Sequence, residues 1–192
     1  MIEEKSYDMF AAAIALAAVK HSTQTRKNGV TPYIYHPIAV AELVRDAGYG
    51  LEYQTVAMLH DVLEDTDTDD GEMAIFGEDI LIAVKLLTRP EGADEAKYVA
   101  NILENPLARV VKNADKICNL RDAILEGEAG APRSKRAKSF AERYIKKAED
   151  YYMGHFSEAL DSTIVWAKEQ LLHELVPEKH AIPRFTKEYL RF

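Results

Sequence analysis

The sequence predicts an all-α protein, folded as a single helical bundle, from two observations. Apolar residues recur with the period of amphipathic helices along most of the chain, and no pair of segments has the pattern of adjoining strands. Glycine and proline separate the successive helical stretches. We therefore expect helices over residues 4–21, 37–47, 51–64, 78–88, 94–104, 107–125, 134–153 and 156–175.

The first two helices follow from local signals. Residues 4–21 hold a long apolar run, and the acidic Glu3, Glu4 and Asp8 stand before it. A secretion signal would begin with positive charge, so we expect this run to form a packed helix and not a leader. The next helix is expected to begin at Pro37, because proline is favoured in the first helical position. An apolar stripe follows it: Ile38, Val40, Ala41, Leu43 and Val44.

The later helices are bounded by breakers: Gly48, Gly50, Gly71, Gly77, residues 90–92, Pro106 and residues 127–132. The helix expected over 134–153 is rich in lysine and arginine, a composition that nucleic-acid-binding segments share. Its apolar residues nevertheless fall on one side: Phe140, Ala141, Tyr144, Ile145 and Ala148. The basic residues are therefore interpreted as the solvated face of a packed helix, and we expect no nucleic-acid partner.

Composition narrows the class of protein. The 192 residues carry a formal net charge of −8, are 47% hydrophobic and include one cysteine, Cys118. A single cysteine excludes a disulfide within the chain and is typical of a reducing compartment. No segment has the length of a membrane-spanning helix. We expect a cytoplasmic protein with no membrane partner, with one domain over residues 1–175. An extension over 176–192 is expected to pack on that domain or on a second subunit of a homo-oligomer.

Two stretches contain side chains that bind metals. His60 and Asp61 lie in MLHDVLEDT, and Asp115 lies in VVKNADKICNL. A mononuclear site with open positions for water needs nitrogen and oxygen ligands from separate segments, and these residues can supply them. His36, just before the helix expected from Pro37, is the most plausible further ligand, although a lone histidine there more often caps or packs. The sequence therefore predicts a metal centre.

Acidic side chains extend the first of these stretches. In a helix over 51–64, His60 and Glu64 would stand one turn apart on the same side. Asp61 and Asp65 have the same spacing, at the point where that helix is expected to end. Glu64 and Asp65 could then orient water or take its proton. The alternative is a solvated acidic helix end, because the negative charge continues along the chain at Asp67, Asp69 and Asp70.

The motifs, in this order along the chain, resemble those of the HD-domain superfamily: RKNG at 26–29, TPYIYHP at 31–37, LHDVLEDT at 59–66 and VKNADKICNLR at 111–121. Within it, the chain resembles the hydrolase domain of the RelA/SpoT enzymes and the stand-alone small alarmone hydrolases of the Mesh1 type. The resemblance covers about residues 5 to 150. An HD pair alone would be weak, whereas HDxxEDT with these partner motifs is specific.

The resemblance implies a manganese-dependent hydrolase that removes the 3′-pyrophosphate from guanosine tetra- and pentaphosphate (ppGpp and pppGpp), the alarmones of the stringent response. It implies these metal ligands: His36, His60, Asp61 and Asp115. It places the catalytic carboxylates at Glu64 and Asp65. The residues expected to contact the small-molecule nucleotide are Arg26, Lys27, Lys112, Asn119 and Tyr144. Nitrogen and oxygen ligands without thiolate also favour Mn(II), with other divalent transition metals as alternatives.

The net charge of −8 would repel a polyphosphate, so local positive charge must outweigh it. Arg26 and Lys27 are the better candidates, because Gly29 and Pro32 fix the loop that follows them. Lys112 and Lys116 are each interpreted in the first place as ordinary lysines of a helix surface, with phosphate binding as the alternative.

Departures from the family pattern keep other functions open. Asn113 replaces the usual aliphatic residue, Cys118 stands where a histidine is common, and the segment over 87–107 is short. One alternative is a hydrolase of another nucleotide, such as a nucleoside phosphate or NADPH. Another is a metal-holding module without turnover. His21 is a weaker candidate for a residue beside the ligands, and nothing after residue 150 is long enough for the synthetase domain of bifunctional relatives.

Overall fold

The structure is a computed structural model that describes residues 2–127 and 129–178. Within these residues the regular elements are helices, and the only β-pairing consists of two isolated bridges, Thr25 with Pro32 and Pro132 with Leu175. The predicted all-α class is confirmed. The chain divides into two compact units, the first ending at Ala114 and the second beginning at Asp115.

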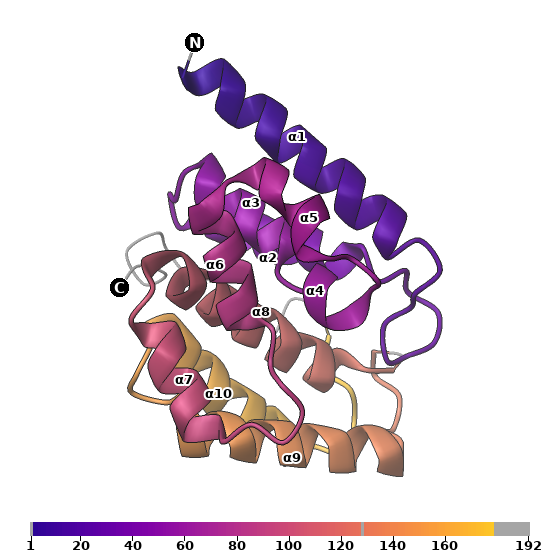
Figure 1. Ribbon diagram of the computed structural model, residues 1–192. Coiled ribbons are helices and arrows are strands. Elements are labelled where there is room, and N and C mark those ends of the chain that lie inside the picture. The colour runs from indigo at the N-terminus through magenta and orange to yellow at the C-terminus, as the bar shows by residue number, and fades with distance from the viewer. Residues whose placement is uncertain (1, 128, 179–192) are drawn as a thin grey trace. The chain divides into compact units, whose positions relative to one another are not determined.

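The first unit is built around a short buried helix. Its elements are α1 (Ile2–Lys20), α2 (Tyr35–Asp46), α3 (Leu51–Leu59), α4 (Val62–Asp65), α5 (Asp70–Met73), the 3₁₀ helix η1 (Ala74–Phe76), α6 (Glu78–Leu87), α7 (Glu95–Leu103) and the first part of α8 (Pro106–Leu125). Helices α1, α2 and α6 all pack against α3 (Figure 1). Every residue from Gln54 to Leu59 is buried, so α3 is the core of this unit.

The second unit contains the rest of α8 with α9 (Lys135–Tyr151) and α10 (Glu158–Leu171), and α9 packs against α10. The chain after α10 returns to the segment before α9, where the N–H of Val176 donates to the carbonyl of Ala131. Residues 179–192 of the predicted extension lie outside the described residues. The division at residue 175 stays a prediction.

The single helix expected over 51–64 is wrong. Helix α3 ends at Leu59 and α4 begins at Val62, so His60 and Asp61 lie in a turn between them. The backbone of Asp61 has φ −103° and ψ −4°, which departs from helical geometry. Apolar residues on both sides of the turn conceal it, because their pattern reads as one amphipathic helix.

Two smaller differences concern helix starts. Helix α2 begins at Tyr35, and Pro37 is therefore its third residue instead of its first. Proline is tolerated there because the first four N–H groups of a helix have no partner within it. Helices α5 and η1 were not expected, since four or three residues are too short to show a period. The side chain of Asp69 caps α5 by accepting from the N–H of Glu72 at 2.9 Å.

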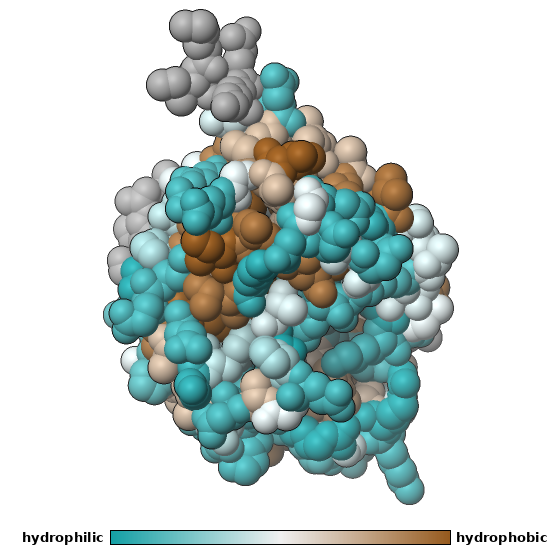
Figure 2. Space-filling model, viewed as in Figure 1, coloured by the Kyte–Doolittle hydropathy of each residue, from teal (hydrophilic) through white to brown (hydrophobic). Residues whose placement is uncertain are grey.

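The surface mixes hydrophilic side chains with smaller apolar areas, as the view in Figure 2 shows. Large apolar side chains with high exposure occur on several elements, including Tyr7 and Val19 on α1 and Ile75 on η1. Single exposed apolar residues are common in folded proteins. In the part of the chain that the structure describes, no helix combines the length and apolar character needed to cross a lipid bilayer.

The packing of α6 predicts different costs for two isoleucines of the same helix. Ile80 is 2% exposed and Ile82 is 43% exposed. We expect Ile80→Ala to lower the free energy of unfolding by about 2–5 kcal/mol, because it leaves a cavity. Ile82→Ala, the matched control, should change it by about 0.5 kcal/mol or less. Urea unfolding followed by circular dichroism measures both, and equal losses would contradict the packing of α6 on α3.

Candidate metal centre

Two histidines and an aspartate converge where α3 ends. His36 Nε2 lies 3.7 Å from Asp61 Oδ2, and His60 Nε2 lies 3.0 Å from the same oxygen. The two imidazole rings have centroids 5.2 Å apart. His36 is 4% exposed and His60 is 2% exposed. The first unit therefore brings together three of the residues that the sequence indicated as metal ligands.

The second ring nitrogen of His60 decides what faces Asp61. His60 Nδ1 lies 2.7 Å from the carbonyl oxygen of Ala57, so Nδ1 carries a proton and donates it there. In a neutral ring Nε2 then has a lone pair, and this lone pair faces the carboxylate. A cation beside these two electron-rich atoms would stabilise them, because the His60 side chain is 2% exposed and that of Asp61 is 18% exposed. A divalent metal ion bound by imidazole nitrogen and carboxylate oxygen is such a cation.

His36 reaches this point from the first turn of α2. Its N–H donates to the carbonyl of Tyr33 at 2.9 Å, which continues the turn that precedes the helix. Pro37 follows directly and limits the backbone, so the imidazole projects from a rigid start of the helix. His36 was expected just before the helix, and in the structure it is the second residue of α2.

Tyr33 connects the cluster to Asp65. Its hydroxyl lies 2.6 Å from Asp61 Oδ2 and 2.9 Å from Asp65 Oδ2. Burial, followed by the negative charges of the two carboxylates, holds the pKa of Tyr33 far above its usual value. The hydroxyl therefore keeps its proton and acts as a donor. Asp61 and Asp65 therefore lie one turn apart on the same side of α4, although the longer helix expected over 51–64 is interrupted before Val62.

Glu64, on α4, is held by a different partner. Its Oε2 accepts a hydrogen bond from the main-chain N–H of Arg89 at 2.9 Å. Burial raises the pKa of Glu64, and the negative charges of Asp61 and Asp65 raise it further. The hydrogen bond from the Arg89 N–H and the positive charge of Lys112 lower it. The net effect is a raised pKa. A carboxylate with a raised pKa is a better proton acceptor near neutral pH.

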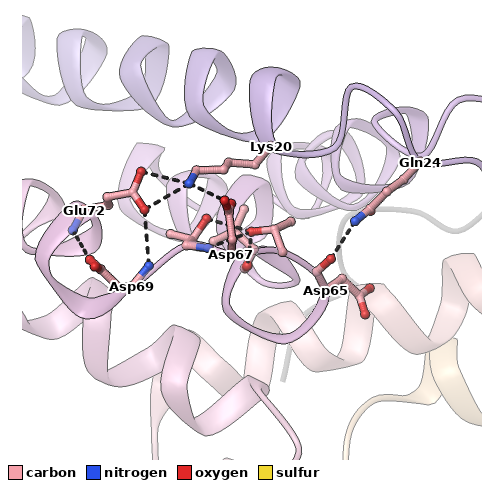
Figure 3. A network of polar contacts seen from close by, with 9 residues as sticks. Lys20, Gln24, Asp65, Asp67, Asp69 and Glu72 are labelled. Atoms are coloured by element: carbon pink, nitrogen blue, oxygen red, sulfur yellow. Dashed lines mark hydrogen bonds and ion pairs between the residues drawn. The ribbon is translucent and has the colours of Figure 1, made fainter.

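The acidic segment after Asp65 is attached to the end of α1, as Figure 3 shows. The Nε2 of Gln24 donates to the main-chain oxygen of Asp65 at 2.5 Å. Lys20 Nζ lies 3.0 Å from Asp67 Oδ1 and 2.9 Å from a carboxylate oxygen of Glu72. The segment is exposed, as in the alternative of a solvated acidic end, but these contacts restrict its path. Exposed ion pairs of this kind stabilise weakly, so their role here is mainly geometric.

Arg26 and Lys27 lie in a tight turn before α2. The N–H of Arg26 donates to the carbonyl of Thr31 at 2.8 Å, and the N–H of Gly29 donates to the carbonyl of Arg26 at 2.8 Å. Gly29 has φ +73°, a conformation that glycine adopts without strain. The guanidinium of Arg26 lies 5.4 Å from the centre of the Tyr33 ring. The turn thus places Arg26 beside the residue that contacts Asp61 and Asp65.

Lys112, on the first part of α8, is half-buried. Its Nζ lies 5.5 Å from the centre of the Tyr98 ring, and its charge acts on the carboxylate of Glu64. Lys112 is thus more than a lysine of a solvated surface, since it contributes positive charge next to one of the two expected catalytic carboxylates.

The remaining predicted residues belong to the second unit. Asp115 is buried, 4% exposed, and Oδ1 of its carboxylate accepts a hydrogen bond from Asn119. Tyr144, on α9, accepts from Lys116 Nζ at 3.3 Å, and the same ammonium lies 4.7 Å from the Tyr144 ring centre and 4.3 Å from that of Tyr152. Lys116 is only 6% exposed, so its interpretation as a lysine of the helix surface was wrong.

Two residues of the centre were not found from the sequence. In the sequence, Tyr33 belongs to the TPYIYHP motif but has no feature that indicates its contacts, and Gln24 lies outside every motif. The only available signal for Tyr33 was its place three residues before His36, and Tyr35 shares that motif. His21, the weaker candidate for a residue beside the ligands, stacks on Tyr33 with ring centroids 4.7 Å apart. It therefore contacts a residue that contacts Asp61.

The comparison with protein families adds an independent observation. The family described as "HD domain" matches residues 13–143. The chain belongs to the HD-domain family. The expected resemblance is confirmed, and the histidine and aspartate cluster of the first unit lies inside the matched region.

Curated relatives carry one recurrent description. A protein from Danio rerio, named guanosine-3′,5′-bis(diphosphate) 3′-pyrophosphohydrolase MESH1, is 36% identical over 118 residues, which cover 57% of this chain and 66% of the relative. The MESH1 protein of Drosophila melanogaster is 30% identical over 158 residues, covering 76% and 85%. A pyrophosphohydrolase of the same name from Aquifex aeolicus is 30% identical over 187 residues, covering 92% and 25%. The chain thus spans just under two-thirds of the Danio rerio protein it matches.

A solved structure is similar as well. It is described as a metazoan orthologue of SpoT that hydrolyses ppGpp, and the superposition has a TM-score of 0.66 at 26% sequence identity. The match covers 84% of this chain and 94% of the other. Family and geometry together support a divalent metal cofactor held by the histidine and aspartate cluster.

A divalent cation should stabilise the folded protein through this cluster. At about 100 times its Kd, a ligand that binds only the folded state adds about 2.7 kcal/mol to the free energy of unfolding. We expect a divalent transition metal to raise the melting temperature above that measured in EDTA, and His60→Ala to remove the shift. His155→Ala, which replaces an exposed histidine outside the cluster, is the control and should keep it. A shift that survives in His60→Ala would contradict the assignment.

Proposed function

We propose that this protein is a metal-dependent phosphohydrolase that removes the 3′-pyrophosphate from guanosine tetraphosphate or pentaphosphate. The observation that carries the proposal is the convergence of His36, His60 and Asp61 beside Asp65. It is supported by the similarity to proteins named guanosine-3′,5′-bis(diphosphate) 3′-pyrophosphohydrolase. The reaction would split the bond between the 3′ oxygen and phosphorus, releasing pyrophosphate.

The proposed ligands are His36, His60, Asp61 and Asp115. Asp115 is included because it stands in the family motif, is buried and is held by Asn119. Two neutral imidazoles and two carboxylates balance the charge of a divalent ion, and the absence of thiolate favours Mn(II). Such an ion, when bound, acts as a Lewis acid toward a phosphate oxygen and lowers the pKa of a bound water.

Asp65 and Glu64 are proposed to orient the attacking water and to accept its proton. The two carboxylates are held from different directions, Asp65 by the Tyr33 hydroxyl and Glu64 by the Arg89 N–H. Each therefore keeps its own orientation and is not free to rotate onto the other. Asp65 is the one joined to the proposed ligand Asp61 through a shared donor, the Tyr33 hydroxyl.

The substrate carries several negative charges, and the protein has a net charge of −8. Arg26 and Lys27, presented by the tight turn, are proposed to bind its phosphates, Arg26 through paired N–H donors. Lys112 is proposed to add positive charge from α8. Asn119 and Tyr144 are proposed to contact the nucleotide, with the Tyr144 ring already oriented by the buried ammonium of Lys116.

The first test of the substrate is direct. Protein loaded with Mn(II) should convert guanosine tetraphosphate to guanosine diphosphate and pyrophosphate, as measured by anion-exchange chromatography. Protein treated with EDTA is the control and should be inactive. NADPH and nucleoside triphosphates are tested in parallel. Hydrolysis of one of these nucleotides without hydrolysis of guanosine tetraphosphate would replace the proposed substrate. No hydrolysis of any of these nucleotides would favour a metal-holding module without turnover.

A second test concerns the proton acceptor. We expect Asp65→Asn to lower kcat by about 10²- to 10⁴-fold, because an amide cannot take a proton from water while it retains the shape of the side chain. Its metal content, measured by inductively coupled plasma mass spectrometry, should equal that of the wild type. Asp79→Asn, an exposed aspartate of α6, is the matched control and should retain full activity. Unchanged kcat in Asp65→Asn would remove Asp65 from the mechanism.

A further inference from the structure

One hydroxyl lies between a proposed metal ligand and a proposed catalytic carboxylate. Tyr33 Oη is 2.6 Å from Asp61 Oδ2 and 2.9 Å from Asp65 Oδ2. A phenol has one proton, so it can donate fully to only one of these oxygens at a time. Asp61 Oδ2 is also the atom that the Nε2 of His60 approaches to 3.0 Å. The Tyr33 hydroxyl is therefore in direct contact with both the proposed metal ligand Asp61 and the proposed catalytic carboxylate Asp65.

Tyr33 is itself held in place. Its ring stacks on His21, with centroids 4.7 Å apart, and His21 is 1% exposed. His21 Nδ1 lies 2.7 Å from Gln24 Oε1, which fixes the tilt of the imidazole. The guanidinium of Arg26 covers the Tyr33 ring at 5.4 Å. The direction of the phenol is thus determined by packing that does not depend on the carboxylates it contacts.

The same segment reaches Asp65 a second time. The amide nitrogen of Gln24 donates to the main-chain oxygen of Asp65 at 2.5 Å, while its amide oxygen is engaged by His21. Tyr33 contacts the side chain of Asp65 and Gln24 contacts its main chain. The connection between α1 and α2 therefore restrains both the main chain and the side chain of Asp65.

We propose that Tyr33 is a positioning residue whose hydroxyl fixes the carboxylates of Asp61 and Asp65 relative to one another. Asp65, the proposed proton acceptor, then keeps its position relative to the Asp61 oxygen that is proposed to bind the metal. This inference rests on the proposed function, because it assigns Asp61 and Asp65 the roles given there. Partners that orient metal ligands commonly contribute 10- to 100-fold to metal affinity or activity. Without the hydroxyl, Asp61 and Asp65 would lose the donor that they share.

The test is Tyr33→Phe, which removes the hydroxyl and keeps the ring that stacks on His21. The matched control is Tyr35→Phe, the same substitution two residues later at a side chain that is 61% exposed. Three quantities are measured for each: the Kd for Mn(II) alone by isothermal titration calorimetry, kcat at saturating Mn(II), and the melting temperature in EDTA. We expect Tyr33→Phe to weaken Mn(II) binding about tenfold and to lower kcat about tenfold or more.

A purely structural role of the hydroxyl would lower the melting temperature and leave Mn(II) affinity and kcat of the folded protein unchanged. That result, or values within about twofold of those of Tyr35→Phe, overturns the proposal. The Mn(II) titration needs no substrate, so it separates the two hypotheses. If the wild type hydrolyses no guanosine nucleotide while Tyr33→Phe still weakens Mn(II) binding, the proposed substrate fails and the positioning of Asp61 by Tyr33 stands.

Discussion

The hydrogen bond from His60 Nδ1 to the carbonyl of Ala57 is the constraint on which the centre depends. It engages one ring nitrogen with the main chain of α3, so Nε2 is the nitrogen that turns toward Asp61. Because His60 is buried, bulk water cannot compensate two facing acceptors. A divalent cation would satisfy both atoms, and His36 adds a second imidazole at the same oxygen. The main chain of α3 thus selects the His60 tautomer that leaves Nε2 available to a metal ion.

The break between α3 and α4 explains why an adjacent histidine and aspartate can act together. In a continuous helix, neighbouring side chains point about 100° apart, since 3.6 residues complete one turn. His60 and Asp61 lie in the turn after Leu59, and there the imidazole and the carboxylate approach to 3.0 Å. Helix α4 then begins at once, and the N–H of Asp65 donates to the carbonyl of Asp61 at 2.9 Å. The interruption removes two positions from the helix, and it brings His60 next to Asp61 while Asp65 follows one turn later.

Periodicity alone was sufficient for the long helices, because α6 and α9 each bury a regular apolar stripe. It failed at His60, where Ala57 to Leu59 and Val62 to Leu63 are apolar on both sides of the turn. The candidate ligands of the first unit were recognisable because few residue types bind metals. Tyr33 was not, since Tyr33 and Tyr35 are chemically identical and only tertiary packing buries one of them. Lys116 was misjudged for the same reason: cation–π contacts with two tyrosines are invisible in a helical pattern.

The lysines around the acidic segment also affect where a cation can settle. Carboxylates at Asp67 and Glu72 are occupied by Lys20, and Asp70 is paired with Lys85. A divalent ion would have to displace an ammonium to bind there, and would gain only exposed oxygens in return. In the cluster, the imidazoles of His36 and His60 are buried and face the carboxylate of Asp61. Pairing with lysine therefore makes these exposed carboxylates weaker competitors for a transition metal than buried imidazoles that face a carboxylate.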